Sequence, residues 1–208
     1  RSSAMEYSAK LAGLGMDLPA DRIITAAEAT ARYLSDQDAA ATVFIAGSPA
    51  LTREIRAAGA VESHNPAFVV AGFDMDMTLA TLSRAVAHLH NGARLIATNP
   101  DPMLPVGTGV EAEAGAVIAF LEAASGQTAY VVGKPNKIIF QQALASLSCG
   151  AEAVAVVGDT AATDIAGATA SGLRSIQVAS GNPGTPGEPH QPTAHMASLV
   201  EIAEHLGN

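Results

Sequence analysis

The sequence predicts an α/β fold built on a mostly parallel sheet. Short apolar runs of four to seven residues alternate along the chain with helical patterns of ten to twelve residues. Strands that alternate with helices of this length form βαβ units, whose sheets are parallel. Hydrophobic residues make up 49% of the 208-residue chain and charged residues 15%, a balance typical of a folded globular protein.

The first helices are indicated by their caps. Ser3 with Glu6, and Thr25 with Glu28, have the spacing of a capping box, in which the first side chain accepts a hydrogen bond from the first helical turn. Pro49 suits the first turn of a third helix, where no N–H is needed. The other elements follow from apolar periodicity. The predicted strands are 42–47, 67–73, 93–98, 129–132, 153–158 and 174–179; the later helices are 79–90, 114–125, 136–147, 162–172 and 196–206; the Pro-rich segment 99–105 and the Gly/Pro-rich segment 180–192 are predicted loops.

Charge and cysteine content exclude several classes of function. The net charge is −9 and no Lys/Arg cluster occurs, so nucleic acid and anionic membranes are poor partners. No apolar run is long enough to span a bilayer, and no secretory signal heads the chain. The single cysteine, Cys149, cannot form an internal disulfide, which suits a reducing compartment. We therefore expect a cytoplasmic protein.

Polar residues that directly follow predicted strands are the candidates for a functional site, because ligands of parallel sheets bind at the carboxyl ends of the strands. Asn99 and Asp101 follow one such strand, Lys134 follows the next, and Asp159 follows a third. The histidines offer no metal site by their spacing: His88 and His90 are two residues apart on a predicted helix and face different sides, and the others have no ligand-spaced partner.

The pair Gly158-Asp159 and the later Asp164 suit a divalent cation. A carboxylate at a strand end can hold Mg²⁺, which takes oxygen ligands and keeps several waters, and a second acid can orient those waters. The plainer alternative is that Asp159 only caps the next helix. Lys134 near such a site suits a phosphoryl group, because its charge offsets that of the group and of the acids. Together these residues favour phosphoryl chemistry.

These motifs resemble those of the haloacid dehalogenase (HAD) superfamily of phosphohydrolases. Lys134 matches the strand-end lysine of the third motif, and Gly158, Asp159, Thr163 and Asp164 match the Gly-Asp-x-x-x-Thr-Asp of the fourth. The order and spacing of "GARLIATNPDPMLP", "GAVIAFLEAASG", "VVGKP" and "VVGDTAATDIAGATASGL" are similar to the NagD-like branch (subfamily IIA), which includes 4-nitrophenylphosphatases and phosphoglycolate phosphatases.

The resemblance implies a Rossmann-like core interrupted by an inserted α/β cap. The cap would cover residues 40–128, and the core would comprise residues 1–39 and 129–208. Members of the branch hydrolyse small phosphate monoesters with Mg²⁺ through an aspartyl-phosphate intermediate, and their caps often pair subunits. We therefore expect a small phosphorylated metabolite as the partner and a homodimer that forms through the cap.

Site roles follow from the same resemblance. Lys134 would be catalytic and would also bind the substrate's phosphoryl group, and Asp159 and Asp164 would hold Mg²⁺. Substrate would also meet the cap loop. The residues expected there are Asn99, Asp101 and Leu104.

The resemblance also implies a missing part. In this branch the first motif, which carries the nucleophilic and the general acid/base aspartates, and the second motif precede the helix that starts after Ser3. We therefore expect an N-terminally truncated core and a chain that is a fragment without its nucleophile. One alternative is a non-catalytic, phosphometabolite-binding or dimerising HAD-like protein.

A second alternative is a capless HAD phosphatase that uses Asp74 and Asp76. The stretch "VVAGFDMDMTL" places both acids after an apolar strand, as in the Asp-x-Asp-Gly-Thr first motif. Met77, however, replaces the glycine that allows the backbone to turn around a phosphoryl group. The NagD-like branch also has a similar pair of acids inside its cap. We therefore interpret Asp74 and Asp76 as cap residues near a helix start.

Overall fold

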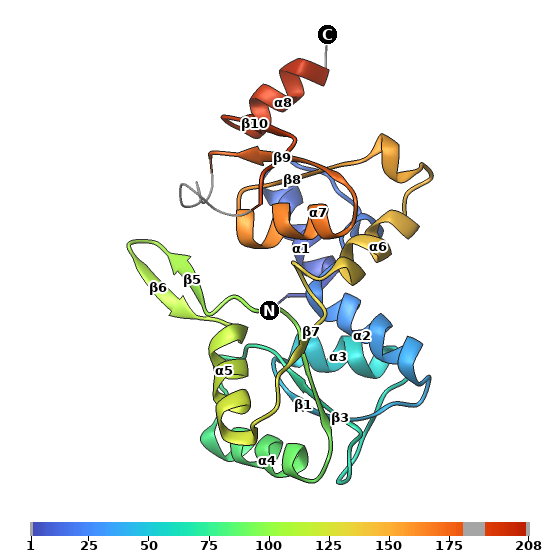
Figure 1. Cartoon of the computed structure of the whole chain (residues 1–208), viewed down its shortest axis with the longest axis vertical. Coiled ribbons are helices and arrows are strands. Elements are labelled where there is room, and N and C mark those ends of the chain that lie inside the picture. Colours follow the sequence, from blue (N-terminus) through green and yellow to red (C-terminus); the bar gives the residue numbers. More distant parts are fainter. Residues whose placement is uncertain (1, 181–189, 207–208) are drawn as a thin grey trace. The chain divides into compact units, whose positions relative to one another are not determined.

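The structure is a computed structural model that describes residues 2–180 and 190–206 (Figure 1). Most of the predicted loop 180–192 therefore lies outside the described residues. The chain forms two compact units, Arg1–Gly133 and Lys134–Asn208. The boundary between the units falls five residues after residue 128, where the cap is predicted to end. Residues 1–39 lie in the first unit, and their assignment to the core stays a prediction.

The first unit is built on a five-stranded parallel sheet, as the sequence predicts. Its strand order is β2-β1-β3-β4-β7, and each neighbouring pair is parallel. All four residues of β3 are buried, which is typical of a strand covered on both faces. The strands are β1 (Thr42–Ala46), β2 (Val61–Glu62), β3 (Phe68–Ala71), β4 (Arg94–Ala97) and β7 (Tyr130–Val131).

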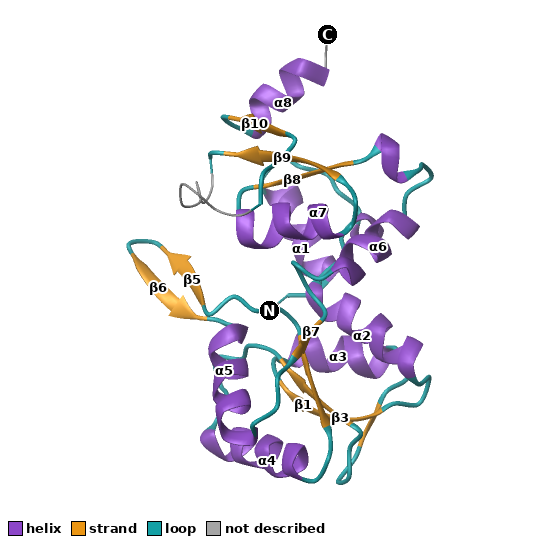
Figure 2. Cartoon of the chain, in the orientation of Figure 1, coloured by secondary structure: helices purple, strands orange, loops and turns teal. Residues whose placement is uncertain are grey.

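Helices cover both faces of this sheet (Figure 2). Helices α4 and α5 lie on one face, and α2 and α3 lie on the other. The helices of this unit are α1 (Ala4–Gly13), α2 (Ala26–Gln37), α3 (Pro49–Ala57), α4 (Leu79–His90) and α5 (Ala114–Ser125), with a 3₁₀ turn at Ala20–Arg22. The first helices begin where their caps predict. Ser3 and Glu6 form a complete capping box, Thr25 accepts from the backbone N of Glu28, and Pro49 occupies the start of α3.

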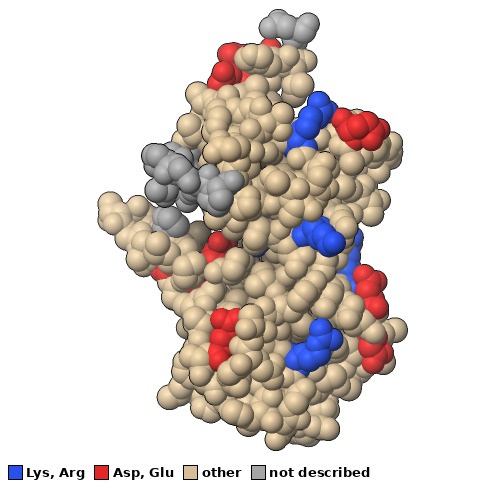
Figure 3. Space-filling view, in the orientation of Figure 1, with Lys and Arg blue, Asp and Glu red and all other residues tan. Residues whose placement is uncertain are grey.

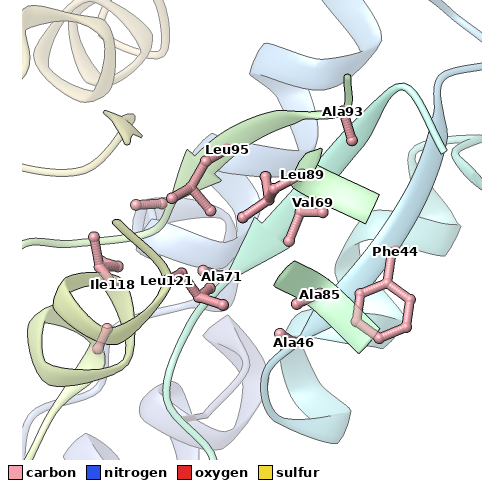
Figure 4. Close-up of a cluster of buried hydrophobic side chains, with 12 residues drawn as sticks. Phe44, Ala46, Val69, Ala71, Ala85, Leu89, Ala93, Leu95, Ile118 and Leu121 are labelled. Atoms are coloured by element: carbon pink, nitrogen blue, oxygen red, sulfur yellow. The ribbon is translucent and has the colours of Figure 1, made fainter. Parts of the chain in front are cut away.

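The main apolar cluster lies between the sheet and helices α4 and α5 (Figure 4). The parallel register aligns Phe44, Val69 and Leu95 in one row across three strands. Ala46, Ala71 and Ala97 form the next row on the same face. Small side chains in that second row let the helices approach the sheet closely. On the opposite face, Tyr33 of α2 stacks on Tyr130 of β7, with ring centroids 5.1 Å apart.

A hairpin interrupts the segment that the sequence predicts as a loop. Strands β5 (Met103–Val106) and β6 (Gly109–Ala112) pair antiparallel and join neither larger sheet. The two-residue turn begins at Gly107, whose φ of +56° is the left-handed conformation that such turns require. The prediction missed the hairpin because each strand has only four residues and Pro105 interrupts the pattern.

The second unit contains a three-stranded parallel sheet in the order β10-β9-β8. Its apolar cluster is formed by Phe140, Ala168 and Leu173. The elements are α6 (Lys137–Ala145), a 3₁₀ turn (Ala151–Ala153), β8 (Ala155–Gly158), a π-helical turn (Ala161–Ile165), α7 (Ala166–Ala170), β9 (Arg174–Val178), β10 (Ala194–Met196) and α8 (Leu199–Leu206). Strand β10 is unpredicted, because three residues show no periodicity, and it takes the start of the predicted final helix.

The surface shows no concentration of positive charge on the face seen in Figure 3. Lys and Arg side chains are scattered there among Asp and Glu, in keeping with the net charge of −9. Within residues 2–180 and 190–206, none of the helices has the length and apolar character needed to cross a membrane.

Candidate functional site

The structure brings Lys134 and Asp164 together. The Nζ of Lys134 donates to Oδ1 of Asp164 over 2.6 Å, although the two residues are thirty positions apart in the chain. The side chain of Asp164 is 9% exposed and that of Lys134 is 49% exposed, so the pair lies at the boundary between interior and solvent. A charge-assisted hydrogen bond of this length is among the stronger polar contacts in proteins.

Asp164 is also held by the backbone in front of it. The amide of Thr160 donates to Oδ2 of Asp164 over 3.1 Å, and the amide of Asp164 donates to the carbonyl of Thr160 over 2.8 Å. Both carboxylate oxygens therefore have a partner. This exchange of hydrogen bonds occurs in the π-helical turn that begins the segment predicted as an ordinary helix at 162–172. Such turns are frequent at functional sites.

Thr160 connects the two acids. Its hydroxyl donates to Oδ1 of Asp159 over 3.4 Å, while its amide bonds Asp164. Asp159 is half-buried directly after β8, and the residue at the cap position of the following turn is Thr160, not Asp159. Sequence reasoning missed Thr160, and its place between the acids of the fourth motif is the signal that would have found it.

Gly158 makes room for Asp164. A Cβ added to Gly158 would lie 2.3 Å from Cβ and 2.5 Å from Oδ2 of Asp164, closer than non-bonded atoms come. The space that a side chain at residue 158 would fill is therefore occupied by the Asp164 carboxylate. Only glycine at the end of β8 allows this acid to reach both Lys134 and Thr160.

The residues present fit a Mg²⁺ ion in part. Asp159 and Asp164 supply carboxylate oxygens beside one threonine, and Mg²⁺ is commonly held by one or two carboxylates with water in the remaining positions. In the part of the chain that the structure describes, no three or more His, Cys, Asp or Glu side chains are grouped to hold a metal. That donor set does not suit a structural zinc ion, which needs four protein ligands.

The substrate residues predicted on the cap loop lie in the first unit, at the end of β4 and on the hairpin. Nδ2 of Asn99 donates to Oδ2 of Asp101 over 3.2 Å, so these two side chains are together. The start of α5 fixes their loop, because the amide of Gly115 donates to the carbonyl of Asp101 over 2.8 Å. Leu104 lies on β5 with 41% of its surface exposed.

The loops after β4 and β7 are held side by side. The amide of Gly133 donates to the carbonyl of Thr98 over 3.0 Å, and a Cβ on Gly133 would lie 2.1 Å from that oxygen. A side chain at residue 133 would therefore separate the two backbones. The glycine before Lys134 and the residue before Asn99 thus form one contact.

Asp74 and Asp76 form a turn ahead of α4. The amide of Asp76 donates to Oδ1 of Asp74 over 3.1 Å, and Thr78 caps the helix. Met77 packs against the main apolar cluster. These acids belong to the first unit, whereas Lys134 and Asp164 belong to the second. A catalytic role for Asp74 and Asp76 stays a prediction.

Family models match both ends of the chain. A haloacid dehalogenase-like hydrolase model matches residues 1–61, and a HAD-hydrolase-like model matches residues 131–202. Among curated proteins, the chain is 34% identical to dihydroxyacetone phosphatase of Corynebacterium glutamicum over 177 residues. These aligned residues cover 85% of the chain and 64% of that protein. The chain thus spans less than two thirds of that relative. It is 33% identical over 178 residues to acid sugar phosphatase of Staphylococcus haemolyticus, covering 85% of the chain and 68% of the relative.

Solved structures are similar over nearly the whole chain. A 4-nitrophenylphosphatase from Thermotoga maritima has a TM-score of 0.91 at 32% identity, covering 97% of the chain and 79% of that structure. NagD from E. coli K-12 has a TM-score of 0.86 at 31% identity, covering 97% and 80%. Glycerol phosphate phosphatase from Mycobacterium tuberculosis, solved in complex with magnesium, has a TM-score of 0.88 at 32% identity, covering 97% and 64%.

Proposed function

The chain belongs to the haloacid dehalogenase-like hydrolases, in their NagD-like subfamily IIA, and from this premise we propose that it is a Mg²⁺-dependent phosphatase of small phosphate monoesters. The observation that carries the proposal is the Lys134–Asp164 ion pair beside Asp159. The names of the relatives support it, because they are phosphatases of dihydroxyacetone, sugar and glycerol phosphates.

In this proposal Lys134 binds the phosphoryl group. Its ammonium carries three N–H donors and gives one to Asp164, so the others are free to meet phosphoryl oxygens. Asp164 positions the ammonium, and the half-exposed lysine stem keeps it accessible to a ligand. Fixed positive charge of this kind lowers the energy of a transferring phosphoryl group.

Asp159 and Asp164 would hold Mg²⁺, with Thr160 keeping the two acids in place. When bound, the cation supplies charge neutralisation at the phosphoryl oxygens. The magnesium complex of the mycobacterial relative supports this choice of metal. The covalent step would form a bond between an aspartate oxygen and phosphorus as the bond to the leaving alkoxide breaks, and water would later release phosphate. We assign the attacking aspartate to none of the described residues.

The loop after β4 and the hairpin are proposed to meet the rest of the substrate. The bond from Asn99 to Asp101 orients the amide of Asn99, and Leu104 presents an apolar, partly exposed surface. An apolar residue there disfavours a substrate carboxylate. The proposed substrate is a small phosphorylated metabolite, and the cytoplasmic location stays a prediction.

The experiment is Mg²⁺-dependent hydrolysis of 4-nitrophenyl phosphate, together with binding of inorganic phosphate. Hydrolysis and phosphate binding are each measured on the 208-residue chain and on the full product of its gene. Lys134→Met should lower hydrolysis about a hundredfold or more, because a charge that stabilises the transition state is lost. Asp159→Asn should raise the Mg²⁺ concentration needed for half-maximal activity about tenfold or more. Lys137→Met, three residues beyond Lys134 on α6, is the matched control and should retain activity.

Other outcomes identify the alternatives. Hydrolysis that survives Lys134→Met but is lost in Asp74→Asn would replace the proposal with the capless phosphatase. Phosphate binding that depends on Lys134, with no hydrolysis by either protein, would favour the non-catalytic binding protein. Absence of both binding and hydrolysis would contradict every version except a HAD-like protein that only dimerises.

A further inference from the structure

The first unit contains an open surface cavity of about 430 Å³ that shares no residue with the Lys134–Asp164 site, and Glu62, His64 and Arg84 in its lining are exposed. It lies between β1, helix α4 and the residues 62–64 at and after the end of β2. Small-molecule sites in proteins have volumes of roughly 300–1,000 Å³, so this one has the size for a small ligand. The lining residues that matter for its chemistry are Phe44, Glu62, Ser63, His64, Thr81 and Arg84.

The cavity forms where α4 passes the edge of the sheet. Thr81, Arg84 and His88 follow one another at intervals of three and four residues, which places them on one face of α4. Figure 4 places Phe44 at the end of the cluster away from Ile118 and Leu121. Strand β2, beyond β1, has only two residues, so little of the sheet extends past Phe44. The face of α4 that carries Arg84 therefore borders an opening.

Arg84 supplies positive charge to this cavity. The guanidinium of Arg84 lies 5.0 Å from the centroid of the Phe44 ring, and within residues 2–180 and 190–206 no carboxylate pairs with it. Glu62 is the acid in the lining, and Arg56 already holds it through Nε at 2.7 Å. Because Glu62 is held by Arg56, the guanidinium of Arg84 remains available to an anion.

A histidine and a hydroxyl group add polar atoms to the lining. His64 lines the cavity, and the ring of His88 packs on Phe44 with centroids 4.8 Å apart. The pKa of His88 is lowered by burial first and then by repulsion from Arg84 and His64, so the ring of His88 lies within electrostatic reach of Arg84 and is less readily protonated than a free histidine. Ser63 accepts a hydrogen bond from the amide of Asn65, which leaves its own hydroxyl proton free to donate.

We propose that this cavity is a second ligand site, which binds the carboxylate or phosphate group of a small metabolite through Arg84, with Ser63 as a further donor. A guanidinium matches both oxyanions with paired N–H donors. A bound anion offsets the positive charge of Arg84. The site does not depend on the proposed phosphatase activity.

The test uses the 208-residue chain and two probes, inorganic phosphate and malonate, titrated separately. NMR follows the side-chain N–H signal of Arg84 and the ring signals of His64 and His88. We expect saturable shifts at these residues with a dissociation constant of about 1 mM or below. The pKa of His88 should rise when the anion is bound, because an anion stabilises the protonated ring. The probe that binds more tightly tells a phosphate ligand from a carboxylate ligand.

The variant Arg84→Gln should weaken binding about tenfold or more, since a charge-assisted hydrogen bond is lost. Arg94→Gln is the matched control. Arg94 also lies over a phenylalanine ring, 5.6 Å from the centroid of Phe68, but it does not line the cavity. Ser63→Ala, which keeps all charges, should weaken binding less. Equal weakening in Arg84→Gln and Arg94→Gln, or no saturable shift of the Arg84 and His64 signals, would overturn the proposal.

Discussion

At the scale of single residues, the site depends on the absence of a side chain at Gly158. Asp164 occupies the space beside the backbone of Gly158, and from there it bonds both Lys134 and Thr160. Its position is thus set by the residue that precedes Asp159, and not only by its own helical turn. Lys134 is in turn held by an acid whose side chain is 9% exposed.

We expect Gly158→Ala to displace Asp164. The new Cβ would lie 2.4 Å from Cγ of Asp164, so the carboxylate must move and the bond to Lys134 must break. The free energy of unfolding should fall by about 1–3 kcal/mol, as in other overpacked sites. Urea unfolding measures the loss. Gly13→Ala is the control: its Cβ would meet nothing within 4 Å, so an equal loss there would contradict the explanation.

His88 gives a prediction for pH. Its pKa lies below the ordinary 6.5, first because of burial and then because of Arg84 and His64. Just below pH 6.5 the unfolded chain therefore binds more protons at this residue than the folded chain does, and the contribution of His88 to stability is lost as the pH falls through that window. Arg84→Gln should raise the pKa of His88, as followed by NMR titration of its ring. Arg94→Gln should leave it unchanged, and a pKa that does not respond to Arg84→Gln would contradict the assigned cause.

At the scale of elements, the sequence predicts what local periodicity controls. The helices at 79–90 and 114–125 have the predicted bounds, because each carries an apolar stripe and ends at a polar or glycine residue. Strands β2 and β10 have two and three residues, too few for any pattern. The π-helical turn was missed for a different reason: it depends on a bond from the amide of Thr160 to a side chain four residues later.

The same division applies to the candidate site. Lys134 and Asp159 could be selected from their places after strands, and Asp164 as the second acid that follows Gly158-Asp159; the resemblance to a known motif supplied their proposed roles. The cavity beside Arg84 could not be predicted, because its lining comes from β1, the end of β2 and α4, and none of these segments carries a ligand-spaced pattern.

Helix α2 allows a test of the predicted caps. Thr25 accepts from the backbone N of Glu28 over 3.1 Å. Thr25→Ala should lower the free energy of unfolding by about 1 kcal/mol, because a helical N–H loses its partner. Thermal or urea unfolding measures this. Thr25→Ser keeps the hydroxyl oxygen and should cost much less, so equal losses in the two variants would show that the contact of the methyl group matters instead.

At the scale of the whole molecule, the edge of the five-stranded sheet matters for assembly. Strand β2 is one of the two edge strands, and 54% of the surface of Val61 is exposed there. Unpaired edge strands with apolar side chains are common sites of association. The expected homodimer should appear in light scattering as a mass of twice 21.0 kDa. A mass of 21.0 kDa at every concentration tested would contradict it.

The hairpin β5–β6 has a consequence for how such a protein can diversify. Its strands pair only with each other, so replacing its side chains disturbs neither the register of the five-stranded sheet nor the Lys134–Asp164 contact. Natural selection can therefore explore new side chains at Leu104 and its neighbours at little cost in stability. If the proposed contact of Leu104 with substrate holds, new substrates can be acquired in this way during evolution while the proposed chemistry at Lys134 is inherited unchanged.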